Sequence, residues 1–171
     1  QQKGNSCGPS CVTMVKAIYH PLKKPSEPEV RGIVALYEAG KQNTGVSSLG
    51  PEAVGLHKWK DVGSNQAPLV LALKATPAPV PGARLEASPS DDVFLSRLCL
   101  CTPKRPGIIG IDWNGGGGHW VVCIGPSKSG DEIMFLDPWT GVETIPNTVA
   151  GLAGYSNGTG TANRSDPIFT H

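Results

Sequence analysis

Three polar side chains stand where a thiol could become a nucleophile. Cys7 lies where turn-like residues give way to an apolar run, so we expect it in the first turn of a helix. Unpaired N–H groups and the positive dipole end of a helix stabilise a thiolate relative to a thiol. His119 opens an apolar strand after glycines 115–118, where its ring could take the thiol proton. Asp137 ends the next strand, where it would fix the tautomer of His119. The pattern predicts nucleophilic catalysis by a cysteine.

A catalytic thiol also needs a polar donor for the oxyanion of the tetrahedral intermediate. Gln1 stands six positions before Cys7, close enough along the chain for its amide to return over the nucleophile. We therefore predict Gln1 as the oxyanion donor, with the adjacent Gln2 as the alternative.

Each of these residues also has a non-catalytic interpretation. A free cysteine such as Cys7 is often a small buried apolar residue. Asp137 followed by Pro138 is a good turn sequence, and needs no catalytic explanation. If His57 were the base instead of His119, a His119→Ala protein would keep its activity. The catalytic interpretation gains from the combination, because three suitable residue types occur in contexts that suit their roles.

The helices that would position Cys7 follow from apolar periodicity and from Gly and Pro. The first is predicted from Cys7 or Gly8 to Tyr19, and Pro21 ends it. The apolar run 69–73 fits either a buried strand or a short helix, and the Pro/Ala-rich stretch 75–89 after it reads as a loop and an insertion. Further helices are expected at about 28–39, from 47 or 48 to 56, and from a cap at Ser90 or Asp91 to Leu100.

The strands that would position His119 and Asp137 are short apolar runs separated by glycine. They are predicted at 107–111, 119–124 and 132–136. The loop 127–131 makes the last two an antiparallel hairpin. Helices before strands predict an α+β domain, with a helical half that carries the nucleophile and an antiparallel half that carries His and Asp. A cleft between the halves would be the natural site.

Length and composition set the class of protein. We expect the 171 residues to form one domain, 1–171, with 39% hydrophobic and 17% charged residues. A net charge of +1 argues against nucleic acid binding, and no apolar run suits a membrane span. Five cysteines leave at least one thiol free in a monomer, and their spacing does not suit a zinc site. No metal or other cofactor is expected.

Three motifs carry a resemblance to a known family, and they read Q-x5-C-G-P-S-C from Gln1, G-H-W-V-V from Gly118 and L-D-P-W from Leu136. They resemble the C39-like, or double-glycine peptidase, branch of the papain-like cysteine peptidases. The resemblance implies Cys7 as nucleophile, His119 as base, Asp137 as orienting residue and Gln1 as oxyanion donor. Between 21 and 104 the likeness is confined to a loose segment at 45–56.

That resemblance implies cleavage of a protein or peptide substrate. Peptidases of this branch commonly cut after Gly-Gly, for which a narrow pocket is expected. Its walls would come from Trp113, Trp120 and Trp139, with Gly118 beside the base. Because related domains occur as bacterial toxin modules, we expect a module excised from a larger polypeptide. Its producer would secrete it into a target bacterial cytoplasm and would need a cognate immunity protein.

Three other functions stay open. The chain could process leader peptides, as exporter-linked members of this branch do. A transglutaminase-like enzyme or a cell-wall amidase would share the thiol mechanism but attack another acyl donor. A binding module on the same fold would need no chemistry, although no predicted catalytic residue is missing here.

Overall fold

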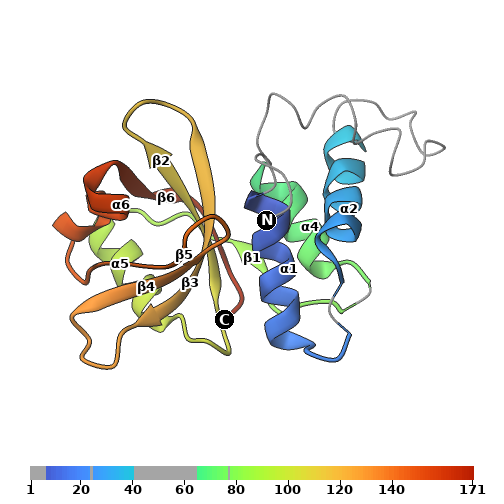
Figure 1. Cartoon of the computed structure of the whole chain (residues 1–171), viewed down its shortest axis with the longest axis horizontal. Helices are drawn as coiled ribbons and strands as arrows, with labels where there is room; N and C mark the ends of the chain where they lie inside the picture. The colour runs from blue at the N-terminus through green and yellow to red at the C-terminus, as the bar shows by residue number, and fades with distance from the viewer. Residues whose placement is uncertain (1–6, 24, 41–64, 77) are drawn as a thin grey trace. The chain divides into compact units, whose positions relative to one another are not determined.

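The computed structural model describes residues 7–23, 25–40, 65–76 and 78–171. Contacts along the chain divide it into two compact units, Gln1–Pro81 and Gly82–His171. The first is helical and the second is built on a β-sheet, so the fold class is α+β, as predicted (Figure 1). The expectation of one domain over 1–171 stays a prediction, and each unit is described by itself.

The helical unit contains α1 (Cys7–Tyr19), α2 (Glu27–Gly40) and α4 (Gln66–Lys74), and each of them contacts the other two. The helix predicted from Cys7 is confirmed, and α2 extends one residue beyond the predicted range at each end. The short helix expected from 47 or 48 to 56 lies outside the described residues. Proline in the first turn suits both α1 and α4, because the N–H that it lacks would have no partner within the helix.

The apolar run at 69–73, which fits a strand or a helix by sequence, belongs to helix α4. Four of its five side chains are buried, and only Leu71 is exposed. An alternating strand would instead expose every second residue if one face met water. The helix buries this run against α1 and α2. The sequence of the run alone does not reveal these contacts.

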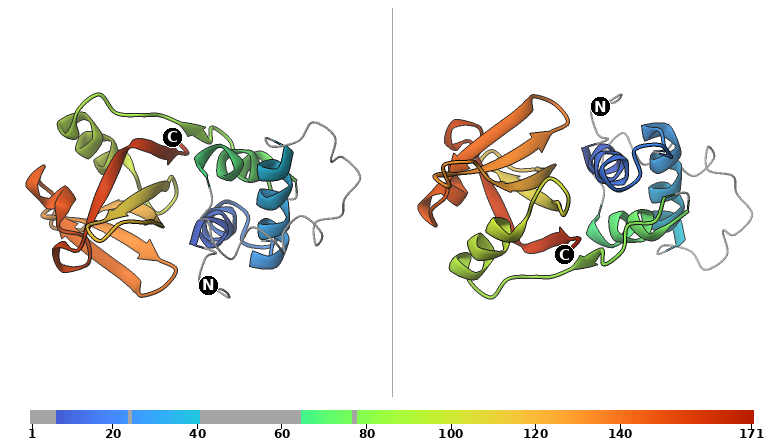
Figure 2. Two further views of the ribbon diagram at one scale, coloured as in Figure 1. Left: turned by 90° about the horizontal axis from the view of Figure 1, so that it is seen from above. Right: turned by 90° about the horizontal axis from the view of Figure 1, so that it is seen from below.

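The second unit is a six-stranded sheet in the order β1-β6-β2-β3-β4-β5, and every neighbouring pair is antiparallel. Figure 2 shows the ribbon of this sheet from two further sides. The predicted strands are confirmed as β2 (Gly107–Trp113), β3 (Gly118–Pro126) and β4 (Glu132–Asp137), and β3 and β4 form the predicted hairpin. The sequence did not predict the other strands, β1 (Arg84–Leu85), β5 (Gly141–Pro146) and β6 (Gly160–Phe169).

Helix α5 (Asp91–Leu100) packs on one face of this sheet. Ser90 caps it as predicted, accepting a hydrogen bond from the N–H of Val93. Its Phe94 and Leu98 are fully buried in a core with side chains from β2, β3, β4 and β5. The 3₁₀ helix η1 (Ala150–Ala153) and the short α6 (Tyr155–Gly158) contribute Leu152 and Tyr155 to the same core.

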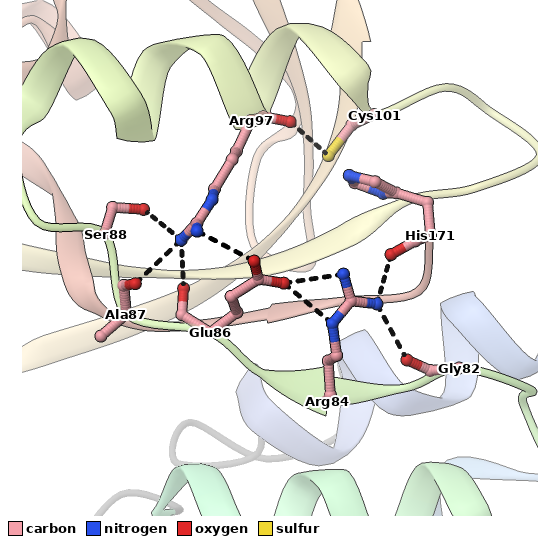
Figure 3. A network of polar contacts seen from close by, with 8 residues as sticks. All are labelled: Gly82, Arg84, Glu86, Ala87, Ser88, Arg97, Cys101 and His171. Atoms are coloured by element: carbon pink, nitrogen blue, oxygen red, sulfur yellow. Dashed lines mark hydrogen bonds and ion pairs between the residues drawn. The ribbon is translucent and has the colours of Figure 1, made fainter.

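The stretch 75–89, expected to be a loop, includes the edge strand β1 and is tied to the sheet unit by arginines (Figure 3). Arg97 of α5 donates to two carbonyl oxygens and one hydroxyl of 86–88, and forms an ion pair with Glu86 at 2.9 Å. Arg84 pairs with the same carboxylate at 2.7 Å and donates to the carbonyl oxygen of His171. The end of this stretch is therefore an ordered part of the second unit.

Candidate active site

The centre of the candidate site is a buried pair, His119 of β3 and Asp137 of β4. Ring nitrogen Nε2 lies 3.0 Å from the Oδ2 atom of Asp137, a normal hydrogen-bond distance. His119 is only 1% exposed and Asp137 6%. Both residues stand near one end of the β3–β4 hairpin, and their side chains lie on the face that carries the core. The sequence-based expectation that Asp137 lies beside His119 is confirmed.

The carboxylate of Asp137 accepts further hydrogen bonds besides that of His119. Its Oδ1 accepts from the backbone N–H of Trp139 at 2.6 Å and of Thr140 at 3.4 Å, because the chain turns back directly after β4. Its Oδ2 also accepts from the hydroxyl of Tyr155 at 2.5 Å. Burial raises the pKa of Asp137, but these hydrogen bonds outweigh it and hold the pKa at about 2. The side chain is therefore a carboxylate at neutral pH.

Tyr155 is a site residue that the sequence did not reveal. It is fully buried and begins α6, within a stretch rich in Gly, Ser and Asn that reads as loop. An isolated aromatic residue in such a stretch is the only signal that the sequence offers. The tyrosine is linked to Asp137 by tertiary contacts that no local pattern encodes.

Two tryptophans predicted to line the substrate site stack around His119. The ring of Trp139 lies 3.8 Å from the imidazole, centroid to centroid, at an interplanar angle of 25°. Trp113 stacks on the imidazole at 5.8 Å and on Trp139 at 6.4 Å. Trp139 is half exposed, so one side of this cluster of His119, Trp113 and Trp139 meets solvent. An imidazole held in this way has little freedom to rotate.

The other two predicted substrate residues lie elsewhere on β3. Side chains alternate along a strand, so Trp120 lies on the opposite face from His119. A Cβ atom on Gly110 would come within 3.5 Å of the Trp120 ring, which places that ring over the glycine. Gly118 is exposed and pairs with Asp112 at the start of the strand. Substrate contacts by Trp120 and Gly118 stay predictions.

The predicted nucleophile, Cys7, is the first residue of α1 and is buried. It stands where the helix has N–H groups without partners inside the helix. One helical turn later, the Ser10 hydroxyl donates to Glu27 of α2 at 3.0 Å, and Glu27 also forms an ion pair with Arg31. These contacts fasten the first turn of α1 to α2. The predicted oxyanion donor Gln1 lies outside the described residues, as does His57.

The sheet unit contains three further cysteines, Cys99, Cys101 and Cys123. Cys101 and Cys123 are fully buried, and their thiols lie near the backbone carbonyls of Arg97 and Leu98. A hydrogen bond with Cys123 and burial strongly raise the pKa of Cys101, so this thiol stays protonated. Cys99 is partly exposed, with its thiol 3.3 Å from Asn147 Oδ1. In the described part of the chain, no three His, Cys, Asp or Glu side chains gather as metal ligands would.

Among the described helices, none is long and apolar enough to cross a membrane.

Comparisons with known proteins give little further guidance. No family model matches the chain, and no curated protein matches its sequence. Among solved structures, the chain is similar to the crystal structure of the Pseudomonas avirulence protein AvrPphB. The TM-score is 0.42 and the sequence identity is 11%, over 97% of this chain and 90% of that one. A similarity this weak does not identify an activity.

Proposed function

We propose that this chain is a cysteine endopeptidase of the papain-like kind, with Cys7 as nucleophile, His119 as general base and Asp137 as the residue that orients the base. The observation that carries the proposal is the buried His119–Asp137 pair, 3.0 Å apart. A histidine held against a carboxylate is the base that a thiol nucleophile requires. The resemblance of the sequence motifs around all three residues supports the same assignment.

The hydrogen bond to Asp137 determines which ring nitrogen of His119 would react. Because Asp137 is ionised, it accepts a hydrogen bond from the N–H at Nε2, so in the neutral ring the lone pair is on Nδ1. Nδ1 would take the proton of Cys7, and the thiolate would attack the carbonyl carbon of the scissile peptide bond. The imidazolium formed in this step would be stabilised by the negative charge of Asp137.

The remaining steps follow from that protonated ring. The tetrahedral oxyanion would accept a hydrogen bond from Gln1, the predicted donor. Collapse of the intermediate breaks the C–N bond, and the leaving amine takes the proton back from His119. Water, activated by the same ring, then hydrolyses the thioester and restores the free thiol. The tryptophans around the imidazole would limit the access of water to the His119–Asp137 hydrogen bond, which would strengthen it.

The substrate proposed for this site is a protein or peptide, cut after Gly-Gly. Trp113 and Trp139 support a narrow site, since they place two large flat rings beside the base. A toxin role in a rival bacterium, with an immunity protein in the producer, rests on the sequence resemblance alone. Matched Gly-Gly and Ala-Ala peptides test the specificity, and equal rates of turnover would contradict it.

The experiment that tests the activity uses a library of peptides made from a whole proteome, with cleavage sites read by mass spectrometry. Wild type is compared with Cys7→Ala and with Cys11→Ala, which removes the buried thiol one turn later in α1. We expect cleavage by wild type and by folded Cys11→Ala, and none by Cys7→Ala. No cleavage by wild type, or equal cleavage by Cys7→Ala, would refute the proposal.

A further inference from the structure

The hydroxyl of Tyr155 and the ring of His119 share one oxygen of Asp137. Oδ2 accepts from the hydroxyl at 2.5 Å and from Nε2 at 3.0 Å. Oδ1 is held by the backbone N–H groups of Trp139 and Thr140. A carboxylate has about four lone-pair positions, so these four donors occupy them all. Water then has no vacant position on either oxygen from which to compete with His119.

Packing leaves the Tyr155 ring little freedom to move away from this oxygen. The side chain is fully buried. Its ring meets Phe135 edge to face, with centroids 5.7 Å apart, and lies tilted against Trp113 at 6.0 Å. Trp113 in turn stacks on His119. The tyrosine therefore contacts both the carboxylate and an aromatic neighbour of the base.

The backbone directly after Tyr155 has an unusual conformation that fixes this placement. Ser156 and Asn157 both have positive φ angles, 48° and 59°, and Gly158 follows with 83°. A left-handed conformation costs a residue with a side chain about 1 kcal/mol, so a chain keeps it only where the surroundings impose it. Here the Asn114 side chain donates to the carbonyl oxygen of Gly158 at 2.9 Å and holds the turn. Strain of this kind is common at functional sites.

We propose that Tyr155 is a positioning residue: its hydroxyl holds Oδ2 of Asp137 in the orientation that receives Nε2 of His119. Its effect on catalysis rests on the proposed peptidase function, whereas its effect on Asp137 does not. Without the hydroxyl, Oδ2 has a vacant lone pair that water can occupy, and the carboxylate can tilt away from the imidazole. His119 would then be less well held in the tautomer that accepts the thiol proton.

The alternative is that the hydroxyl serves stability alone, since buried tyrosines generally find a hydrogen-bond partner. Thr170 offers a matched control in the same unit. Its buried hydroxyl donates to the carbonyl oxygen of Pro106 at 2.6 Å. Thr170 directly follows β6. The opposite end of that strand begins at Gly160, which pairs with Trp113. A loss of stability alone would make Tyr155→Phe and Thr170→Val behave alike.

The test compares Tyr155→Phe, which keeps the ring and removes the hydroxyl, with Thr170→Val. We expect Tyr155→Phe to lower kcat roughly 10- to 100-fold with little change in KM, and Thr170→Val to leave both unchanged. In an Asp137→Asn background, Tyr155→Phe should cause almost no further loss, because the tyrosine acts through that carboxylate. An equal loss of kcat in both backgrounds would overturn the proposal.

A second readout needs no substrate. The titration of the Asp137 carboxyl is followed by ¹³C NMR. Among the described residues, the titratable side chains that form hydrogen bonds with this carboxyl are His119 and Tyr155. Tyr155→Phe should raise the pKa of Asp137, since the hydroxyl lowers it, and Thr170→Val should not. An unmoved titration would overturn the positioning role. A moved titration in a protein that cleaves no peptide would refute the peptidase and leave the positioning role standing.

Discussion

The sheet unit and the helical unit differ in what surrounds the two proposed reactive groups. In the sheet unit, His119 is held by side chains. Its ring bonds the carboxylate of Asp137, which also accepts from Tyr155, and two tryptophans stack on it. In the helical unit, Cys7 stands at the start of a helix, where backbone N–H groups supply the electrostatics. Substitution of one side chain around His119 should therefore lower the activity only in part. The backbone N–H groups around Cys7 cannot be removed by a side-chain substitution unless α1 unfolds.

Among changes that leave the proposed nucleophile and base in place, Asp137→Asn should have the largest effect on activity. The amide cannot carry the negative charge that stabilises the imidazolium, and it can present an N–H to Nε2 and reverse the tautomer. We expect kcat to fall about 10³- to 10⁴-fold, measured on the best peptide from the library. A fall of less than about tenfold would mean that the pair is only structural.

The largest effect on stability should come from Gly125→Ala. Gly125 has a φ of +89°, and an added Cβ would lie 2.0 Å from the carbonyl oxygen of Cys101, a backbone atom that cannot move alone. We expect a loss of roughly 3 kcal/mol or more in the free energy of unfolding, measured with urea. Gly115→Ala, in open space, is the control and should change little. Equal effects would show that β3 does not approach Cys101 this closely.

Acid should weaken the sheet unit through Asp137. Its folded pKa of about 2 lies below its unfolded value, so its stabilising contribution is complete above about pH 5 and is lost as pH falls toward 2. The contribution is on the order of 2 kcal/mol. As the pH falls through this range, the free energy of unfolding of wild type should fall by about 2 kcal/mol more than that of Asp137→Asn. Parallel curves for the two proteins would contradict the assigned hydrogen bonds.

The smallest effect is expected in the helical unit, from Ser10→Ala. This change removes the hydroxyl that donates to Glu27, but Glu27 keeps its ion pair with Arg31. We expect a loss of about 1 kcal/mol in unfolding free energy. The fall in kcat should be far smaller than for Asp137→Asn, because α1 still begins at Cys7. A loss of activity as large as that of Asp137→Asn would show that side chains also prepare the thiol.

Sequence periodicity predicted the elements whose apolar pattern is strong. Helix α1 and strands β2, β3 and β4 are such elements, and the hairpin order alone placed His119 beside Asp137. Strand β6 escaped prediction because its middle, 163–167, is polar and ends in proline. It forms because it pairs with β2, which is a tertiary contact.

The same limit applies inside the candidate site. Asp137 and Trp139 were found because they share a short motif at the end of β4. Tyr155 lies 18 positions beyond Asp137, within residues typical of a loop. Its role depends on a turn with left-handed residues and on packing against Phe135 and Trp113, which only the folded unit supplies.

The central claim, that His119 activates Cys7, is tested most directly by alkylation with iodoacetamide. Native wild type and His119→Ala are labelled at about pH 6, below the range where an ordinary thiol reacts well, and the labelled site is identified by mass spectrometry. We predict that Cys7 is labelled first among the five cysteines, and roughly tenfold or more slowly in His119→Ala. Even labelling of all five cysteines, or a Cys7 rate that His119→Ala leaves unchanged, would contradict the account.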